Sequence, residues 1–93
     1  MKLVWDESKN RINQAKHKVS FEMAQYVFDD PLHISRQDRI ERGEQRWQTI
    51  GLVQGVVVLL VAHTVIEADG LETIRIISAR KADKTERRIY EQG

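Results

Sequence analysis

The chain has 93 residues, of which 41% are hydrophobic, so residues 1–93 can form one domain with a single modest core. Fifteen basic residues stand against 14 acidic ones, and the resulting net charge of +1 argues against a general polyanion binder. The absence of cysteine excludes disulfides, a thiolate nucleophile and a cysteine-ligated zinc site. The first ten residues are polar and the longest apolar run, Val56–Ala62, is too short to span a bilayer, so we expect a soluble cytoplasmic protein.

Charge is unevenly distributed along the chain. Residues 1–20 and 75–93 each carry a net charge of +3, whereas residues 21–45 and 46–74 carry −3 and −2. From Arg75 to Arg88, six basic residues stand against two acidic ones. A solvated helix face has such a composition, and so does a phosphate-binding edge, so both interpretations stay open.

The first third of the chain predicts a short strand at residues 2–5 and two helices. The first helix runs from about Glu7 to Lys16, with Ile12 and Ala15 as its only obvious core residues. The second begins after Ser20, a typical N-cap residue, and ends before the only proline in the chain.

Two further segments are predicted on either side of the central strands, one after the second helix and one at the C-terminus. Leu32–Ser35 predicts a short strand, and the mixed charges and glycine of Arg36–Gln45 predict an exposed loop. A terminal helix is expected over Thr85–Glu91, introduced by a capping box of Asp83 and Glu86.

Three strands are predicted between these segments, at residues 46–53, 56–66 and 72–80. The middle strand is apolar on both faces, which is typical of a central strand covered on both sides. The turn signals at Gln54-Gly55 and Asp69-Gly70 predict an antiparallel meander. We therefore expect an α+β domain in the order β-α-α-β-β-β-β-α, an antiparallel sheet with helices mainly on one face.

Two-residue turns would pair Val53 with Val56 and Ala68 with Leu71. In this register His63 lies within one rung of Arg46, and Arg80 shares their face. Arg75 pairs with Thr64 on the opposite face, unless a longer second turn brings it beside His63.

No metal or cofactor is expected, because the three histidines lack the spacing of a helical pair and no glycine-rich phosphate loop is present. What remains is a set of cations and histidines beside apolar strands, with Glu44 and Glu72 as possible bases: Lys16, His17, Arg46, His63, Arg75 and Arg80. Cleaving RNA without a metal requires a base for the 2′-OH proton, an acid for the leaving oxygen and cations for the phosphorane, and this set contains all three.

Within this set, His63 is the first candidate for acid or base, with Glu44 or Lys16 as substitutes. Arg46, Arg75 and Arg80 are candidates for binding the phosphate. Structural alternatives stay open: a hydrogen-bonded His63 at the sheet end, an ion pair of Arg75 with Glu44 or Glu72, and compensation of a helix dipole by Lys16-His17.

Nearly the whole chain resembles a known family through an ordered series of short motifs. These motifs are Trp5-Asp6-Glu7, Asn13-x-x-Lys16-His17, Val19-Ser20-Phe21-Glu22, Asp30-Pro31, Gly43-Glu44-x-Arg46, Ile50-Gly51, Thr64, Arg75-Ile-Ile-Ser-Ala-Arg80-x-Ala82, Glu86 and Tyr90-Glu91. They resemble the BrnT toxins.

The resemblance implies a bacterial type II toxin with a RelE-like fold that cleaves RNA and so inhibits translation and growth. It also implies neutralisation by a BrnA-like antitoxin, through which the complex would reach DNA. Two departures are visible: Lys18 stands where a glycine is expected, and Val65-Ile66 replaces an acid–arginine pair, which removes a possible active-site cation.

We therefore expect a metal-independent endoribonuclease whose catalytic residues are His63, Arg75, Arg80 and Arg46 and whose RNA-binding residues are Lys16, His17, Arg75 and Arg80. We also expect an acidic partner to cover the basic face of Lys16, His17, Arg75 and Arg80. The alternative is a non-catalytic module that uses the same basic face to hold RNA or an acidic protein.

Overall fold

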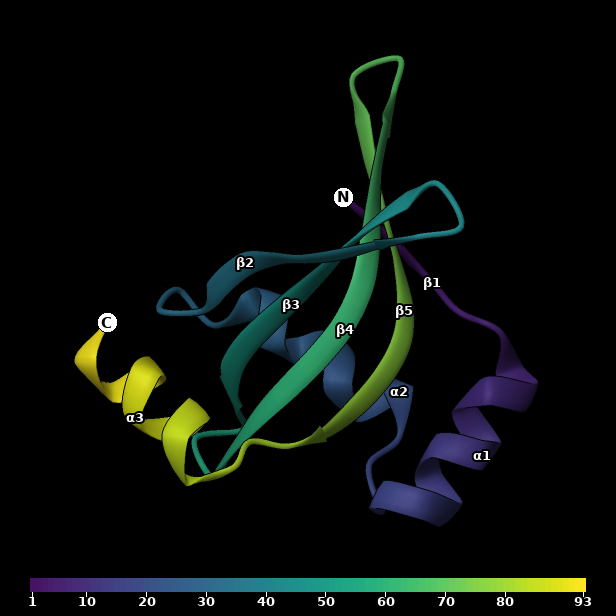
Figure 1. Ribbon diagram of the computed structural model, residues 1–93. Coiled ribbons are helices and arrows are strands. Elements are labelled where there is room, and N and C mark those ends of the chain that lie inside the picture. The colour runs from purple at the N-terminus through teal and green to yellow at the C-terminus, as the bar shows by residue number, and fades with distance from the viewer.

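The computed structural model describes all residues from Met1 to Gly93, and its elements follow the predicted order (Figure 1). They are β1 (Lys2–Val4), α1 (Glu7–His17), α2 (Phe21–Ala24), η1 (Gln25–Asp29), β2 (Ile34–Glu41), β3 (Glu44–Val53), β4 (Val57–Ala68), β5 (Leu71–Lys81) and α3 (Lys84–Gln92). None of the helices combines the length and the apolarity that crossing a lipid bilayer requires.

The five strands form one sheet in the order β1-β5-β4-β3-β2, which confirms β4 as the central strand between β3 and β5. The sheet is mixed rather than purely antiparallel, because β1 runs parallel to β5 and pairs Lys2 with Thr73 and Val4 with Arg75. Parallel neighbours need a long connection, and here everything from α1 to β4 lies between the two strands in sequence.

The prediction of a loop over Arg36–Gln45 is wrong, because Ile34–Glu41 forms the whole of strand β2. Arg42 and Gly43 both have positive φ and turn the chain directly into β3. β2 is an edge strand with exposed side chains on both faces, so it carries no apolar alternation by which the sequence could reveal it.

One face of the sheet, called the covered face here, holds the main hydrophobic core. Helices α2 and η1 lie behind the sheet in Figure 1, and α1 stands beside β5. The core consists of residues from the second helical segment and from three strands: Val19, Phe21, Ala24, Val27, Val53, Leu59, Val61, Ile76 and Ala79. Gly51 permits this packing, because a Cβ there would lie 2.9 Å from the carbonyl oxygen of Val27.

The expected core residues of α1 are not those that attach it. Ile12 is 66% exposed and Ala15 is exposed, whereas Asn10 and Asn13 are buried. Asn10 accepts a hydrogen bond from the backbone N–H of Phe21 at 2.8 Å, so the amide side chains bind this helix to its neighbours.

The other side of the sheet, called the open face here, is covered at one end by the C-terminal helix. Ile50 and Leu60 pair across β3 and β4 and are buried outside the main core. The predicted capping box of Asp83 and Glu86 is present and begins α3. Beyond it, the Tyr90 hydroxyl donates a 2.6 Å hydrogen bond to Asp30, which ties α3 to the end of η1.

Candidate active site

The turn between β3 and β4 determines the face of the sheet on which Arg46 lies. Val53 pairs with Val57 rather than Val56, because three residues instead of two form the loop. Trp47 therefore pairs with His63, and its neighbour Arg46 points to the opposite face. The expectation that Arg46 shares the face of His63 is wrong, since a shift of one residue reverses every side chain of a strand.

A β-bulge in β5 brings two arginines to the same face. Ile76 pairs with His63 and Ser78 pairs with Ala62, so Ile77 has no partner. Regular alternation would place Arg75 and Arg80 on opposite faces, as the sequence analysis expected. The extra residue reverses the alternation, and both arginines lie on the open face.

Glu44 joins two of the arginines on the open face. Its Oε1 atom lies 2.7 Å from Nη2 of Arg75 and 3.8 Å from Nη2 of Arg46. The predicted pairing of Arg75 with Thr64 is present, which places the Thr64 side chain on this face as well. Of the two carboxylates considered as partners of Arg75, the structure therefore selects Glu44.

Arg80 makes a two-pronged contact with the start of α3. Its Nη1 and Nη2 atoms donate to the two carboxylate oxygens of Glu86 at 2.7 and 2.9 Å. These hydrogen bonds outweigh burial and hold the pKa of Glu86 below its ordinary value. The same carboxylate completes the capping box, so one residue orients both the helix and the arginine.

Sequence reasoning missed Arg36, which the open face also carries. Arg36 pairs with Gln48 across β2 and β3, and its Nε atom donates to the Gln48 side chain at 3.2 Å. The turn-forming pair Arg42-Gly43 was the available signal, because a hairpin there would have converted the assumed loop into a strand.

His63 lies on the covered face and is 2% exposed. Its Nε2 atom lies 2.7 Å from the Thr49 hydroxyl and its Nδ1 atom 3.3 Å from the Thr64 carbonyl oxygen. Since a carbonyl only accepts, Nδ1 carries the proton and Thr49 donates to Nε2. Phe28 packs edge-on against the ring at 5.0 Å, and burial lowers the pKa of His63 so that it is neutral at pH 7.

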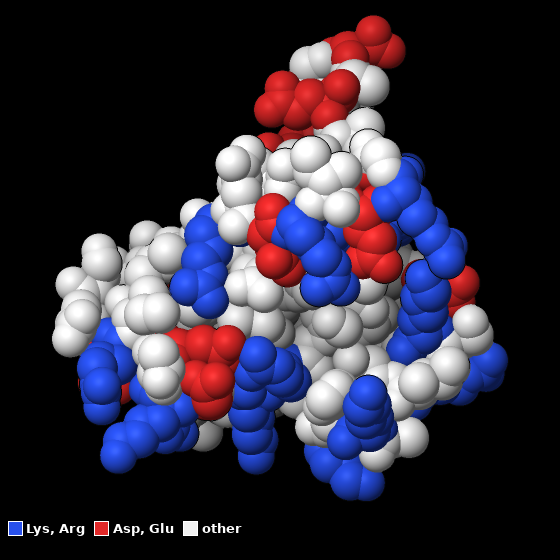
Figure 2. Space-filling model, viewed as in Figure 1, with Lys and Arg blue, Asp and Glu red and all other residues white.

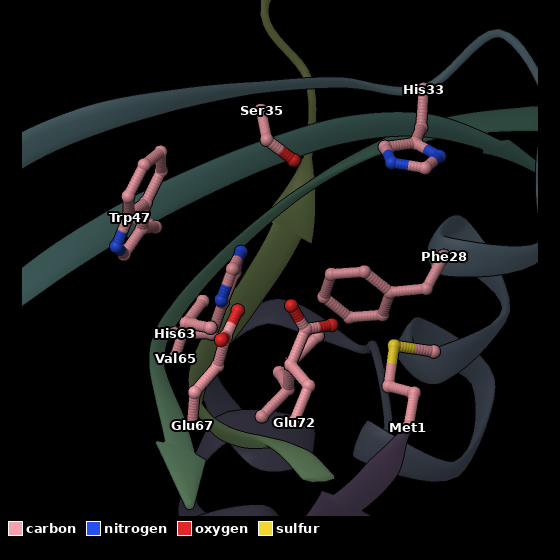
Figure 3. Close-up of a pocket in the computed structure, with 10 residues that line it drawn as sticks. Met1, Phe28, His33, Ser35, Trp47, His63, Val65, Glu67 and Glu72 are labelled. Atoms are coloured by element: carbon pink, nitrogen blue, oxygen red, sulfur yellow. The ribbon is translucent and has the colours of Figure 1, made fainter. Parts of the chain in front are cut away.

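His63 forms one wall of a pocket of about 420 Å³ at the end of the covered face, shown in Figure 3. Phe28 and Trp47 line it from either side, and the carboxylates of Glu67 and Glu72 point into it. These two acids face each other across β4 and β5. The structure thus places Glu72, one of the possible bases, on the opposite side of the sheet from Arg75.

Lys16 and His17 lie on the last turn of α1, beside β5. Together with Ile77 and Ser78 they line a shallow pocket of about 200 Å³. Ser78 follows the bulge and belongs to the open face, so these two basic residues flank the arginine face at its β5 side. The two basic residues of α1 therefore lie beside the part of β5 between Arg75 and Arg80.

The charge of the molecule is separated in space (Figure 2). Most of the charged side chains that border the pale hollow on the face turned to the viewer are lysine and arginine, with a few acidic ones among them, whereas the tip of the β4–β5 hairpin at the top is acidic. No Lys or Arg occurs between Arg46 and Arg75, and this stretch contains Glu67, Asp69 and Glu72. The arrangement favours the approach of an anionic ligand to the open face rather than to the hairpin tip.

Chemically, the open face can bind a phosphate group and accept a proton. Arginine forks supply fixed positive charge, and Glu44 is a carboxylate that is only half-buried beside them. These are two of the three parts that acid–base cleavage of a phosphodiester requires, the cations and the base.

A comparison of the sequence with protein families matches residues 5–86 to the family described as the ribonuclease toxin, BrnT, of type II toxin–antitoxin systems. The chain belongs to this family. Membership makes it a ribonuclease toxin whose system includes an antitoxin and whose target is RNA. No curated protein matches the sequence.

The fold is also similar to a solved BrnT structure. The crystal structure of the Brucella abortus ribonuclease toxin, BrnT, superposes with a TM-score of 0.63 at 23% sequence identity. The match covers 90% of this chain and 99% of the other. It confirms the small α+β architecture, and the site residues rest on the geometry given above.

Proposed function

We propose that this BrnT-family chain cleaves RNA on the open face of its sheet without a metal ion, and that residues 1–93 act as one toxin domain. Arg46, Arg75 and Arg80 bind the scissile phosphate and stabilise the additional charge of the transition state. The observation that carries the proposal is the placement of these arginines on one face, with Glu44 2.7 Å from Arg75.

In this mechanism Glu44 is the general base. It removes the proton of the ribose 2′-OH, the 2′-oxygen attacks phosphorus, and the bond to the 5′-oxygen breaks. The leaving 5′-oxygen takes a proton from an acid, for which Lys16 is our candidate, and the products are a 2′,3′-cyclic phosphate and a 5′-hydroxyl. Lys16 and His17 also hold the RNA strand beside the arginines.

The proposal gives His63 a supporting role. Both of its ring nitrogens are hydrogen-bonded inside the protein, and the side chain faces away from the three arginines. A general acid or base must reach the substrate proton directly or through one water molecule. Glu44, the substitute identified in the sequence, lies on the open face with 39% of its side chain exposed, which supports its choice as the base.

In the resting cell, the toxin must be masked. We propose that a BrnA-like antitoxin with an acidic surface covers Lys16, His17, Arg75 and Arg80, and that the complex reaches DNA only through the antitoxin. Complementary charge accelerates association and makes its rate sensitive to salt. Released toxin then cleaves RNA in the cytoplasm and stops translation and growth.

The first test is cleavage of RNA by purified protein in the presence of a chelator. Wild type should cleave, and Arg46→Ala, Arg75→Ala or Arg80→Ala should lower the rate about 10²–10³-fold, the usual cost of one well-aimed donor. Arg75→Lys should not restore full activity, because lysine lacks the two-pronged fork. Arg39→Ala is the matched control, since Arg39 is exposed and pairs only with Glu41.

The roles of the acids and bases are separated by two further variants. Glu44→Gln should abolish cleavage, whereas a folded His63→Ala protein should retain it. Full activity of all three arginine variants would show that the site lies elsewhere.

The competing function is a binding module that uses the same arginines without catalysis. It predicts that wild type retains RNA on the open face, leaves it intact and causes no growth arrest when expressed. RNA cleavage lost together with RNA binding in the arginine variants would contradict it.

A further inference from the structure

Two polar atoms on the open face are buried without a hydrogen-bond partner: the hydroxyl oxygen of Thr64 and the Nε atom of Arg46. Thr64 is only 2% exposed. Leaving such groups unpaired is costly, and folded proteins rarely do so without a reason. Arg46 precedes Trp47 and Thr64 follows His63, and Trp47 pairs with His63 across adjacent antiparallel strands, so the unpaired atoms belong to the same part of the sheet.

The ion pair of Glu44 and Arg75 lies in the same part of the open face. Thr64 is the direct cross-strand partner of Arg75, and Glu44 approaches both Arg75 and Arg46. The side chains of Glu44 and Arg75 are 39% and 43% exposed, whereas that of Arg46 is 18% exposed. The ion pair is thus the outer layer, and the unpaired atoms lie beneath it.

Together these groups define the chemistry of a ligand. The Arg46 Nε–H can only donate, the Thr64 hydroxyl can donate, and both guanidinium groups are positively charged. They suit an anion with several acceptor oxygens, and a phosphodiester presents two non-bridging oxygens on one phosphorus. The single carboxylate of Glu44 contacts the guanidinium groups and leaves the two deeper donors unused.

We propose that the Thr64 hydroxyl and the Arg46 Nε–H form the floor of the phosphate site, and that Glu44 closes this site in the free protein by holding Arg75. The inference rests on the proposed function and adds a substrate-binding residue and a closing contact to it. When an RNA phosphate enters, Arg75 exchanges Glu44 for phosphate oxygens, and the released carboxylate is beside the ribose as a base. Phosphate binding and the release of Glu44 as a base then occur in the same step.

The proposal predicts an unusual combination for Thr64→Val. Valine has the shape of threonine and removes the unpaired hydroxyl, so the variant should melt about 4 °C higher than wild type. The same change should weaken phosphate binding about tenfold, because a hydrogen bond to a charged group is lost. The higher melting temperature follows from the burial of the unpaired hydroxyl alone. A threonine that only fills space would leave phosphate binding unchanged.

The experiment is a titration of the full chain with inorganic phosphate, followed by NMR of the arginine Nε–H signals. Phosphate should shift the Arg46 signal in wild type and in Thr64→Ser, which keeps the hydroxyl. Thr73→Val is the matched control, since Thr73 lies two residues from Arg75 on the same face and has no part in the site. Glu44→Gln should bind phosphate more tightly, because the competing carboxylate charge is gone.

The outcomes separate this inference from the proposed function. Unchanged phosphate affinity in both Thr64→Val and Glu44→Gln, or a lower melting temperature with unchanged affinity in Thr64→Val, overturns the inference, even if wild type cleaves RNA. Conversely, weaker phosphate binding in Thr64→Val and tighter binding in Glu44→Gln uphold it, even if wild type fails to cleave. Should Thr64→Val not fold, Thr64→Ser and Glu44→Gln still decide the matter through the Arg46 signal.

Discussion

The side chain of Asn13, on α1, completes the free edge of β5 at Ala79. It accepts a hydrogen bond from the backbone N–H of Ala79 at 3.1 Å and donates one to its carbonyl oxygen at 2.8 Å. The edge is free because β1 pairs with β5 only from Thr73 to Arg75. The Asn13 amide thus forms the two hydrogen bonds that a neighbouring strand would form with Ala79. Ala79 lies just beyond the bulge that positions the arginines.

Replacing Asn13 with alanine should therefore destabilise the protein strongly. The change leaves the buried N–H and C=O groups of Ala79 unpaired, at a cost of about 1–3 kcal/mol for each. Urea unfolding should show a loss of about 2 kcal/mol or more. Gln14→Ala removes an exposed amide from the adjacent position and should change the stability by less than about 0.5 kcal/mol. Equal effects of the two substitutions would contradict the role given to Asn13.

Lys18→Gly should stabilise the protein. Lys18 ends α1 with φ of 61°, in the left-handed region where a side chain costs about 1 kcal/mol and glycine does not. Its position is the one at which the family resemblance led us to expect glycine. Thermal unfolding should show a gain of about 0.5–1 kcal/mol, whereas Gln14→Gly inside the same helix should lose about 1 kcal/mol. A loss at both positions would mean that the backbone at Lys18 is not strained.

Stability should fall as the pH drops from 7 to 5, in part because of His63. Burial lowers its folded-state pKa below the ordinary 6.5, so the unfolded chain binds a proton more readily. The contribution of His63 to the free energy of unfolding is therefore fully present above about pH 6.5 and decreases as the pH falls through that value. His63→Gln should flatten this part of a plot of stability against pH. An unchanged slope in His63→Gln would show that folding does not lower the pKa of His63.

The hydroxyl of Tyr90 should hold α3 in place. It donates to Asp30, and this hydrogen bond raises the pKa of Tyr90 to about 12. Because the folded-state pKa is raised, the contribution is present below pH 10 and is lost as the pH rises through about 12. Tyr90→Phe should cost about 1–3 kcal/mol at pH 7. Tyr26→Phe is the control, since Tyr26 is 49% exposed and its hydroxyl bonds no other group of the protein.

The sequence predicted those features that depend on local pattern. The doubly apolar run of β4, the N-cap at Ser20 and the capping box at Asp83 all behave as their residues indicate. Features that depend on partners elsewhere in the chain were not readable. Asn13 is polar because it serves the backbone of a strand 66 positions away, and no local pattern records that distance.

The candidate site shows the same division. Arg46, Arg75, Arg80 and Glu44 were identified by type, but their common face depends on a three-residue loop and on one bulge. Around Ile77, both sets of alternate residues contain apolar side chains, so the sequence does not show which set faces the core. Which arginines meet was therefore decided by register rather than by composition.

The unpaired Ile77 separates the length of β5 from the face on which its arginines lie. Deleting this one residue would restore an unbroken ladder between β4 and β5 and leave every arginine in the sequence. Arg75 and Arg80 would then be four positions apart in a regular strand, so each would keep its partner on β4 and both would stay on the open face. A single in-frame codon loss at this position would thus shorten the chain without disarming the toxin, a tolerance that a scan of substitutions would never sample.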